Sequence, residues 1–311
     1  MYIHNEHVWS TVVSLHIDAP ALNGQQLDAA RNDVVQFVHY VDDVFSTFKP
    51  TSLVSQYRRG EITDAELEVR EDAAARDLVD VIALCRKALI TSRGAFDPWK
   101  ADGGFDPSGL VKGWAAQRAC ELLKQHGITR AYVNAGGDVY SFTDGEPWVG
   151  GVQDPDDRMQ VVKVSSIAGE GASCTSGTYE RGEHLIDPHV GGHSTGARSA
   201  SVIGPDGALA DAYATAICVD GEKAIEWFHE RRAGEAGYEP APVRAAGYYV
   251  NENYVAARNS ERQQPGWKPG SVTPLSQEWD VAAVFFNEPI ARSGQSGYLL
   301  ASDTPSQFMA S

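Results

Sequence analysis

The sequence predicts an α+β fold, and three observations lead to this prediction. One segment near the start alternates apolar and polar residues as a half-buried strand does. Several later segments repeat apolar residues at the three- and four-residue spacing of amphipathic helices. The remaining short strands form hairpins, without the regular strand-helix-strand alternation of a parallel sheet. We therefore expect an antiparallel sheet with packed helices.

The first half of the chain predicts one strand and three helices. Residues 8–17 form the strand, because alternate apolar positions fall on one face. Residues 25–45 predict an amphipathic helix, and similar spacing predicts helices over 73–92 and 112–126. The last two helices end where Gly94 and Gly127 supply typical C-cap residues.

The second half predicts mainly strands. Extended runs on both sides of the DG pair in TDGEP predict a hairpin, and a strand over 199–203 leads through GPDG into a helix over 208–217. Further short strands are expected over 248–256. After about residue 259 the composition shifts to Gln, Pro, Gly and Ser. We therefore expect one domain over 1–258 and a C-terminal tail over 259–311, either disordered or packed on the domain.

Composition excludes several classes of partner. The formal net charge is −16 over 311 residues, and no clustered basic face offsets it, which argues against nucleic acid and anionic membrane surfaces. No apolar run approaches the roughly 20 residues of a membrane span, and the first residues lack the pattern of a signal peptide. The four cysteines form no CxxC pair, so buried reduced thiols are expected. These features predict a cytoplasmic protein.

One helix combines an acid and a hydroxyl with small neighbours. In ALADAYATAI, Asp211 and Thr215 are four residues apart, which places their Cβ atoms about 6 Å apart on one face. Carboxylate and hydroxyl oxygens suit a hard cation such as Mg²⁺. A structural interpretation stays open, because the helix dipole favours an acid near its N-terminus and a Thr inside a helix often bonds the carbonyl four residues back.

Two further segments could carry chemistry. FDPSGLVKGWAAQRA is a glycine-containing loop that enters a helix, so its free N–H groups and Lys112 could bind an anion, although the glycines could simply serve the turn. The spacing of a P-loop is absent. His184 could be a general base, or it could be a packed or solvent-facing histidine.

Taken in order, several motifs resemble those of the ApbE family, the FAD:protein FMN transferases. They cover roughly residues 8–256 and read FSTFKPTSLVSQY, GAFDPW, FDPSGLVKGWAAQRACELL, YVNAGGD, CTSGTY, HLIDP and ADAYATA. The resemblance implies an ApbE-like (T-fold-like) domain. It also implies an enzyme that uses Mg²⁺ to transfer FMN from FAD to a Thr or Ser hydroxyl of an acceptor protein, through a phosphodiester bond, with release of AMP.

The resemblance also implies roles for individual residues. The metal ligands would be the side chains of Asp211 and Thr215 and the main-chain carbonyl of Gly109. His184 would deprotonate the acceptor hydroxyl. The residues implied to contact FAD are Phe48, Ala95, Phe96, Asp97, Asp106, Lys112, Ser176 and Ile186.

Two other functions use the same residues. An FAD pyrophosphatase would place water where the transferase places the acceptor hydroxyl, and a flavin-binding protein would have no turnover. The sequence leaves open which acceptor protein is modified and whether Mg²⁺ or Mn²⁺ is used.

Overall fold

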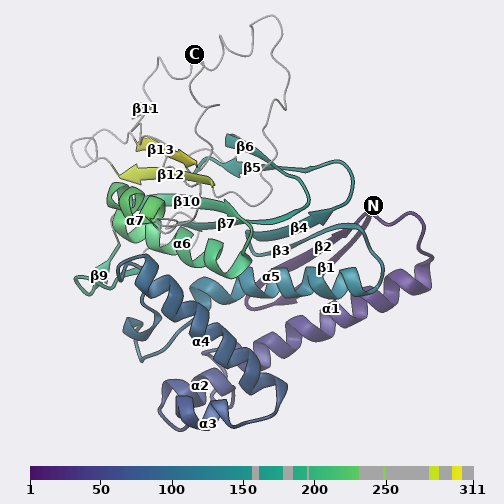
Figure 1. The fold of residues 1–311 in the computed structure, drawn as a ribbon, viewed down its shortest axis with the longest axis horizontal. Helices are drawn as coiled ribbons and strands as arrows, with labels where there is room; N and C mark the ends of the chain where they lie inside the picture. The colour runs from purple at the N-terminus through teal and green to yellow at the C-terminus, as the bar shows by residue number, and fades with distance from the viewer. Residues whose placement is uncertain are drawn as a thin grey trace, which may run out of the picture.

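A computed structural model describes residues 1–155, 161–177, 185–194, 196–230, 248–249, 280–286 and 296–302. Its main feature is a nine-stranded sheet in the order β1-β2-β3-β4-β7-β10-β12-β13-β11, and each paired strand runs antiparallel to its neighbour. Helices α1, α4, α5 and α6 lie together on one side of this sheet, and α2 and α3 lie beyond α4 (Figure 1). This arrangement confirms the predicted α+β class with an antiparallel sheet and packed helices.

The strands that build the sheet span both halves of the chain. Two small additional sheets pair β5 with β6 and β8 with β9. The strand bounds are β1 Tyr2–Val8, β2 Thr11–Ile17, β3 Arg130–Ala135, β4 Asp138–Thr143, β5 Trp148–Gln153, β6 Val161–Ile167, β7 Glu170–Gly177, β8 Ile186–Asp187, β9 Gly192–His193, β10 Ala197–Gly204, β11 Tyr248–Tyr249, β12 Asp280–Phe286 and β13 Ser296–Ser302.

The helices begin at polar caps. Asn23 starts α1 with a capping box, Asp72 accepts an N–H bond at the start of α4, and Asp206 does the same for α6. The α-helix bounds are α1 Gly24–Phe45, α2 Leu53–Arg58, α3 Asp64–Glu68, α4 Ala73–Thr91, α5 Ser108–Gln125, α6 Gly207–Asp220 and α7 Ala224–Glu230. The predicted helices are confirmed, although α5 begins four residues before the predicted start at 112.

The predicted strand over 8–17 is in fact two strands and a turn. β1 and β2 form a hairpin whose turn residues, Trp9 and Ser10, both have φ of 56°. The prediction missed this turn because neither residue is one of the Gly, Asn or Asp residues that usually take positive φ in a hairpin. On β2 the predicted inward face is correct for Val13, Leu15 and Ile17, which are fully buried.

The hairpin predicted around the DG pair is also wrong. β4 pairs with β3 and β7, whereas β5, which follows the DG pair, pairs with β6 in a separate sheet. The tight turn of this region joins β3 to β4 at Gly136 and Gly137, whose φ values of 67° and 106° favour glycine. The turn places Asp138 at the first position of β4.

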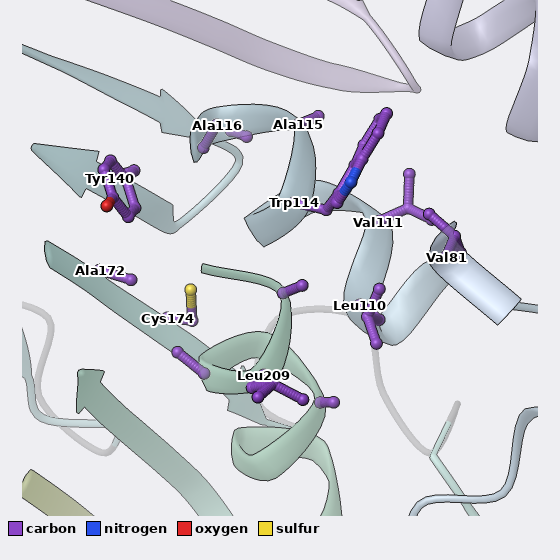
Figure 2. Packing of buried hydrophobic residues seen from close by; sticks show 14 of the residues in the cluster. Val81, Leu110, Val111, Trp114, Ala115, Ala116, Tyr140, Ala172, Cys174 and Leu209 are labelled. Carbon is purple, nitrogen blue, oxygen red and sulfur yellow. The ribbon is translucent and has the colours of Figure 1, made fainter. Parts of the chain in front are cut away.

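Helices α5 and α6 approach each other so closely that two glycines are required at the contact. A Cβ atom on Gly113 would lie 2.0 Å from the carbonyl oxygen of Gly207, and one on Gly207 would lie 2.4 Å from that of Gly113. Figure 2 shows the buried side chains around this contact, with Leu110 on α5 and Leu209 on α6. The close contact fixes the position of α6, and therefore of Asp211, relative to α5.

Helix α6 is buried on nearly all sides.

All four cysteines are free and buried, as expected. Within the part of the chain that the structure describes, no helix has the length and apolar character needed to cross a membrane.

Strands β12 and β13 lie inside the segment that the sequence assigned to a tail. β12 pairs with β10 along Ala197–Ile203, and β13 pairs with β12. Of the predicted strands over 248–256, β11 covers Tyr248–Tyr249 and pairs with β13. The rest of that prediction and the predicted boundary at residue 258 lie outside the described residues.

Candidate active site

A cavity of about 550 Å³ opens beside the N-terminal end of α5 and the side of α6 that carries Asp211 and Thr215. This volume is within the range, roughly 300–1,000 Å³, of pockets that take small-molecule ligands. Its lining comes from the segment before α5, from α5, α6 and β7, and from the β8–β9 hairpin. Ten predicted site residues line it: Ala95, Phe96, Asp97, Asp106, Gly109, Lys112, Ser176, Ile186, Asp211 and Thr215.

Asp211 occupies the buried wall of the cavity with one oxygen unpaired. Its Oδ2 atom accepts a hydrogen bond from the Gly113 N–H at 3.1 Å. Its Oδ1 atom is the one buried side-chain oxygen or nitrogen among the described residues that has no hydrogen-bond partner. Burial, with the nearby charge of Asp138, raises the pKa of Asp211 to about 7. An unpaired buried oxygen of this kind needs a ligand or a proton.

Lys112 is the positive group nearest to this oxygen. Its ammonium forms an ion pair with Asp138 and lies 3.8 Å from Asp211 Oδ1. Burial lowers the pKa of Lys112, but the charges of Asp138 and Asp211 outweigh burial and hold the pKa above its usual value. Lys112 therefore stays protonated at neutral pH.

Neutral oxygens complete the surroundings of Asp211. Thr215, one turn further along α6, exchanges a hydrogen bond of 2.9 Å with Ser176 on β7. Gly109 faces them from α5, since a Cβ atom on it would lie 3.0 Å from the Thr215 hydroxyl oxygen. The ψ angle of Gly109 is 18° where a helix has about −42°, which turns its carbonyl away from the helical direction.

These residues fit a hard divalent cation. One carboxylate, hydroxyl oxygens and a displaced carbonyl form the all-oxygen set that Mg²⁺ and Mn²⁺ prefer, and they leave positions for water or ligand phosphates. Among the described residues no group of three or more His, Cys, Asp or Glu side chains is arranged to hold a metal. In the described part of the chain, hydroxyl and carbonyl oxygens would therefore have to complete the ligands of a cation bound at Asp211.

The segment before α5 forms the opposite wall. Asp97 caps a short 3₁₀ helix (Pro98–Lys100) and accepts a bond from the Trp99 N–H at 3.1 Å. Asp106 accepts a bond of 3.0 Å from the Ser108 N–H, so one of the free N–H groups expected at the start of α5 is already paired. Ala95 and Phe96 are almost fully buried and present only small surfaces to the cavity.

Two predicted site residues are not among the described residues that line this cavity. Phe48 is 93% exposed and lies outside the cavity, in a small adjoining groove of about 80 Å³ that shares Ser108 with it. His184 lies outside the described residues, so its predicted role as general base stays a prediction.

The sequence analysis did not select several residues that belong to this site. Asp138 is fully buried against Lys112, and His193 lines the cavity from β9. A signal for Asp138 was present in NAGGD, where an acid directly follows the glycine turn that begins a strand. The other cavity-lining residues that were missed are Pro98, Lys100, Ala101, Asp102, Ser108, Gly136, Thr175, Gly177, Leu185 and Pro188.

Comparisons with known proteins agree with the resemblance. Residues 99–237 match the model of the ApbE family. The chain is 35% identical over 192 residues to the FAD:protein FMN transferase of Rhodobacter capsulatus, a match that covers 57% of this chain and 35% of that protein. It is 38% identical over 149 residues to the FAD:protein FMN transferase of Escherichia coli strain K12, covering 43% and 41%.

The fold is similar to that of a solved structure. The flavin transferase ApbE from Vibrio cholerae aligns over 99% of this chain and 97% of its own, with a TM-score of 0.64 and 15% sequence identity. The sequence matches to curated relatives are shorter, since the chain spans 35% and 41% of the lengths of the two relatives named above. The matched residues include the cavity walls formed by α5, β7 and α6. Residues 99–237 thus match the ApbE family, and the fold of the chain is that of the ApbE flavin transferases.

Proposed function

We propose that this protein transfers FMN from FAD to a Thr or Ser hydroxyl of an acceptor protein, with Mg²⁺, and releases AMP. One observation carries the proposal. The unpaired Oδ1 of Asp211 lies buried in the wall of a ligand-sized cavity, beside Thr215 and Gly109, in a chain with the ApbE fold. The segment that matches the ApbE family model, residues 99–237, contains these residues, and two relatives of 35% and 38% identity are named FAD:protein FMN transferases.

The charge of the cavity supports a requirement for a cation. Its lining carries four carboxylates, from Asp97, Asp102, Asp106 and Asp211, against two ammonium groups, from Lys100 and Lys112. A diphosphate brings further negative charge into this acidic lining, so it needs a compensating positive charge to bind. Asp211, Thr215 and the Gly109 carbonyl would hold a Mg²⁺ ion, which when bound neutralises charge on phosphoryl oxygens.

The residues of the chain have separate tasks in the proposed reaction. Lys112, which stays protonated, would bind phosphate oxygens of FAD. The acceptor oxygen forms a bond to the phosphorus of the FMN half, the pyrophosphate bond breaks, and AMP leaves with the bridging oxygen. His184 would take the proton of the acceptor hydroxyl. Ala95, Phe96, Asp97, Asp106, Ser176 and Ile186 would contact FAD from the cavity walls, and Phe48 from the adjoining groove.

The proposal is tested by AMP release from FAD, followed by chromatography. Reactions contain or omit Mg²⁺ and a purified acceptor domain with a Thr flavinylation motif, and the mass of the acceptor is measured in parallel. We expect AMP and an FMN adduct only when both are present. Asp211→Asn should abolish both products. Asp28→Asn, which changes a half-exposed acid on α1 away from the cavity, is the matched control and should leave both unchanged.

Two outcomes would replace the proposal. Metal-dependent AMP release without an adduct on any hydroxyl-bearing acceptor would identify an FAD pyrophosphatase, in which water takes the place of the acceptor. Tight FAD binding without AMP release would identify a flavin-binding protein.

A further inference from the structure

The cavity wall contains a buried group of three charges that the proposed reaction does not fully use. Lys112 from α5 lies between Asp138 at the start of β4 and Asp211 on α6. Both carboxylates are fully buried, and a quarter of the Lys112 side-chain surface is exposed. The group carries a formal charge of −1, and the proposed function assigns roles to Lys112 and Asp211 but none to Asp138.

Asp138 is held firmly on both of its oxygens. Oδ2 contacts the Lys112 ammonium, and Oδ1 accepts a hydrogen bond of 3.1 Å from the Thr175 N–H on β7. The backbone of Asp138 is fixed as well, because β4 pairs with β3 at this position, directly after the glycine turn. This carboxylate is therefore a rigid counter-charge that draws the ammonium toward the sheet.

Asp211 Oδ1 is in the opposite situation. Its nearest cation is the same ammonium, at 3.8 Å, a distance too long for a hydrogen bond. A lysine side chain is long and flexible, and it would close such a gap easily if no other carboxylate held it. A lysine bonded to Oδ1 would occupy the oxygen that the proposed cation needs.

From this arrangement we infer that Asp138 is a positioning residue that holds Lys112 away from Asp211 and so keeps Asp211 Oδ1 open for the divalent cation. The inference rests on the proposed function for the identity of the cation. It assigns Asp138 a role through Lys112, without contact between Asp138 and the substrate. Without Asp138, the ammonium would move to Asp211 and compete with the cation.

The inference predicts that two substitutions depend on each other. Asp138→Asn releases Lys112, so it should weaken cation binding when Lys112 is present. In a Lys112→Met background no ammonium is available to compete, so Asp138→Asn should have little effect. A simple loss of negative charge near the cation would instead weaken binding by the same factor in both backgrounds, because independent effects add.

The test is Mn²⁺ binding to the metal-free, FAD-free full chain, measured from the electron paramagnetic resonance signal of unbound Mn²⁺. Wild type, Asp138→Asn, Lys112→Met and the double variant complete a double-mutant cycle. We expect Asp138→Asn to lower Mn²⁺ affinity about tenfold or more when Lys112 is present and less than about threefold in the Lys112→Met background. Asp138→Glu, which keeps the counter-charge, should retain most of the affinity. Asp28→Asn is the matched control for loss of one acid.

Equal losses in the two backgrounds, or the same loss in Asp138→Glu as in Asp138→Asn, would overturn the inference. Far-ultraviolet circular dichroism verifies that each variant is folded, and Asp138→Ser replaces the Asn variant in the cycle if the latter does not fold. Since the measurement uses neither FAD nor an acceptor, its result is independent of AMP release. A chain that fails to cleave FAD but shows the expected coupling would refute the proposed function and keep the role of Asp138.

Discussion

Gly113→Ala tests whether the contact between α5 and α6 controls both stability and the site. The added Cβ atom would lie 2.0 Å from the Gly207 carbonyl oxygen and 2.9 Å from the Cβ atom of Asp211. Ordinary contacts of a Cβ atom begin at 3.4 Å, so the two backbones would have to separate by about 1.4 Å at this point. Neither neighbour is the end of a flexible side chain that could turn away.

The size of the effect follows from three contributions. Overpacking of a close contact costs about 1–3 kcal/mol, and here backbone must move, which favours the upper end. Separation of the helices also weakens the hydrogen bond from the Gly113 N–H to Asp211 Oδ2, and a bond to a carboxylate contributes about 1.5–3 kcal/mol. Replacement of Gly by Ala inside a helix returns about 1 kcal/mol. We expect a net loss of about 2–4 kcal/mol in the free energy of unfolding.

Urea denaturation followed by circular dichroism measures this loss. The matched control is Gly24→Ala, at the first residue of α1, where an added Cβ atom meets nothing within 4 Å. The control should be neutral or stabilising by up to about 1 kcal/mol. A Gly113→Ala variant as stable as the wild type would show that α5 and α6 are further apart than the structure has them, and the reasoning on Asp211 would lose its basis.

Three further predictions concern the cavity and the groove beside it. In the metal-free protein the raised pKa of Asp211 means that its ionisation disfavours the folded state. The wild type should therefore lose about 2–3 kcal/mol of stability relative to Asp211→Asn as the pH rises from 5 to 8, most of it below pH 7. Urea titrations of both proteins at the two pH values measure this, and a constant difference in stability would contradict it. Gly109→Ala places a methyl group 3.0 Å from the Thr215 hydroxyl and 3.3 Å from Phe96. The rate of FAD cleavage should fall about tenfold or more, while the urea midpoint of unfolding changes little. An unchanged kcat/KM in steady-state kinetics would show that Gly109 is not part of the site. Phe48→Ala should change stability by less than about 0.5 kcal/mol, because the ring is exposed, and should raise the KM for FAD with unchanged kcat; an unchanged KM would place Phe48 outside the FAD site.

Local patterns in the sequence predicted the elements whose burial is periodic. Val34 and Val38 of α1 are buried as their spacing indicated, since an amphipathic helix shows its inner face in its own sequence. The hairpin turn at Trp9 and Ser10 gave no such signal, because its unusual backbone angles occur at residues that rarely adopt them. The pairing of β5 with β6 instead of β4 could not be predicted either, because both edges of β4 are already paired, with β3 and with the later strand β7.

The candidate site likewise contains features that the sequence could predict and features that it could not. Asp211 and Thr215 could be selected from residue type and helical spacing alone, and the family motifs added the lining residues of α5 and β7. The unpaired oxygen of Asp211 could not be predicted, because it depends on where Lys112 lies. That position is set by Asp138, which is 26 residues away in the chain and belongs to a different layer of the fold.

The pairing of β10 with β12 has a consequence for how the chain is made. A ribosome synthesises β10 and α6 before it reaches β12, so the nascent helix that carries Asp211 is present while one long edge of its supporting strand has no neighbour. An open edge of this kind is a template for pairing with other chains. Expression at lower temperature, or with a chaperone that shields extended segments, should therefore increase the yield of folded protein. The increase should be larger than that from substitutions on the side of the sheet that the helices cover.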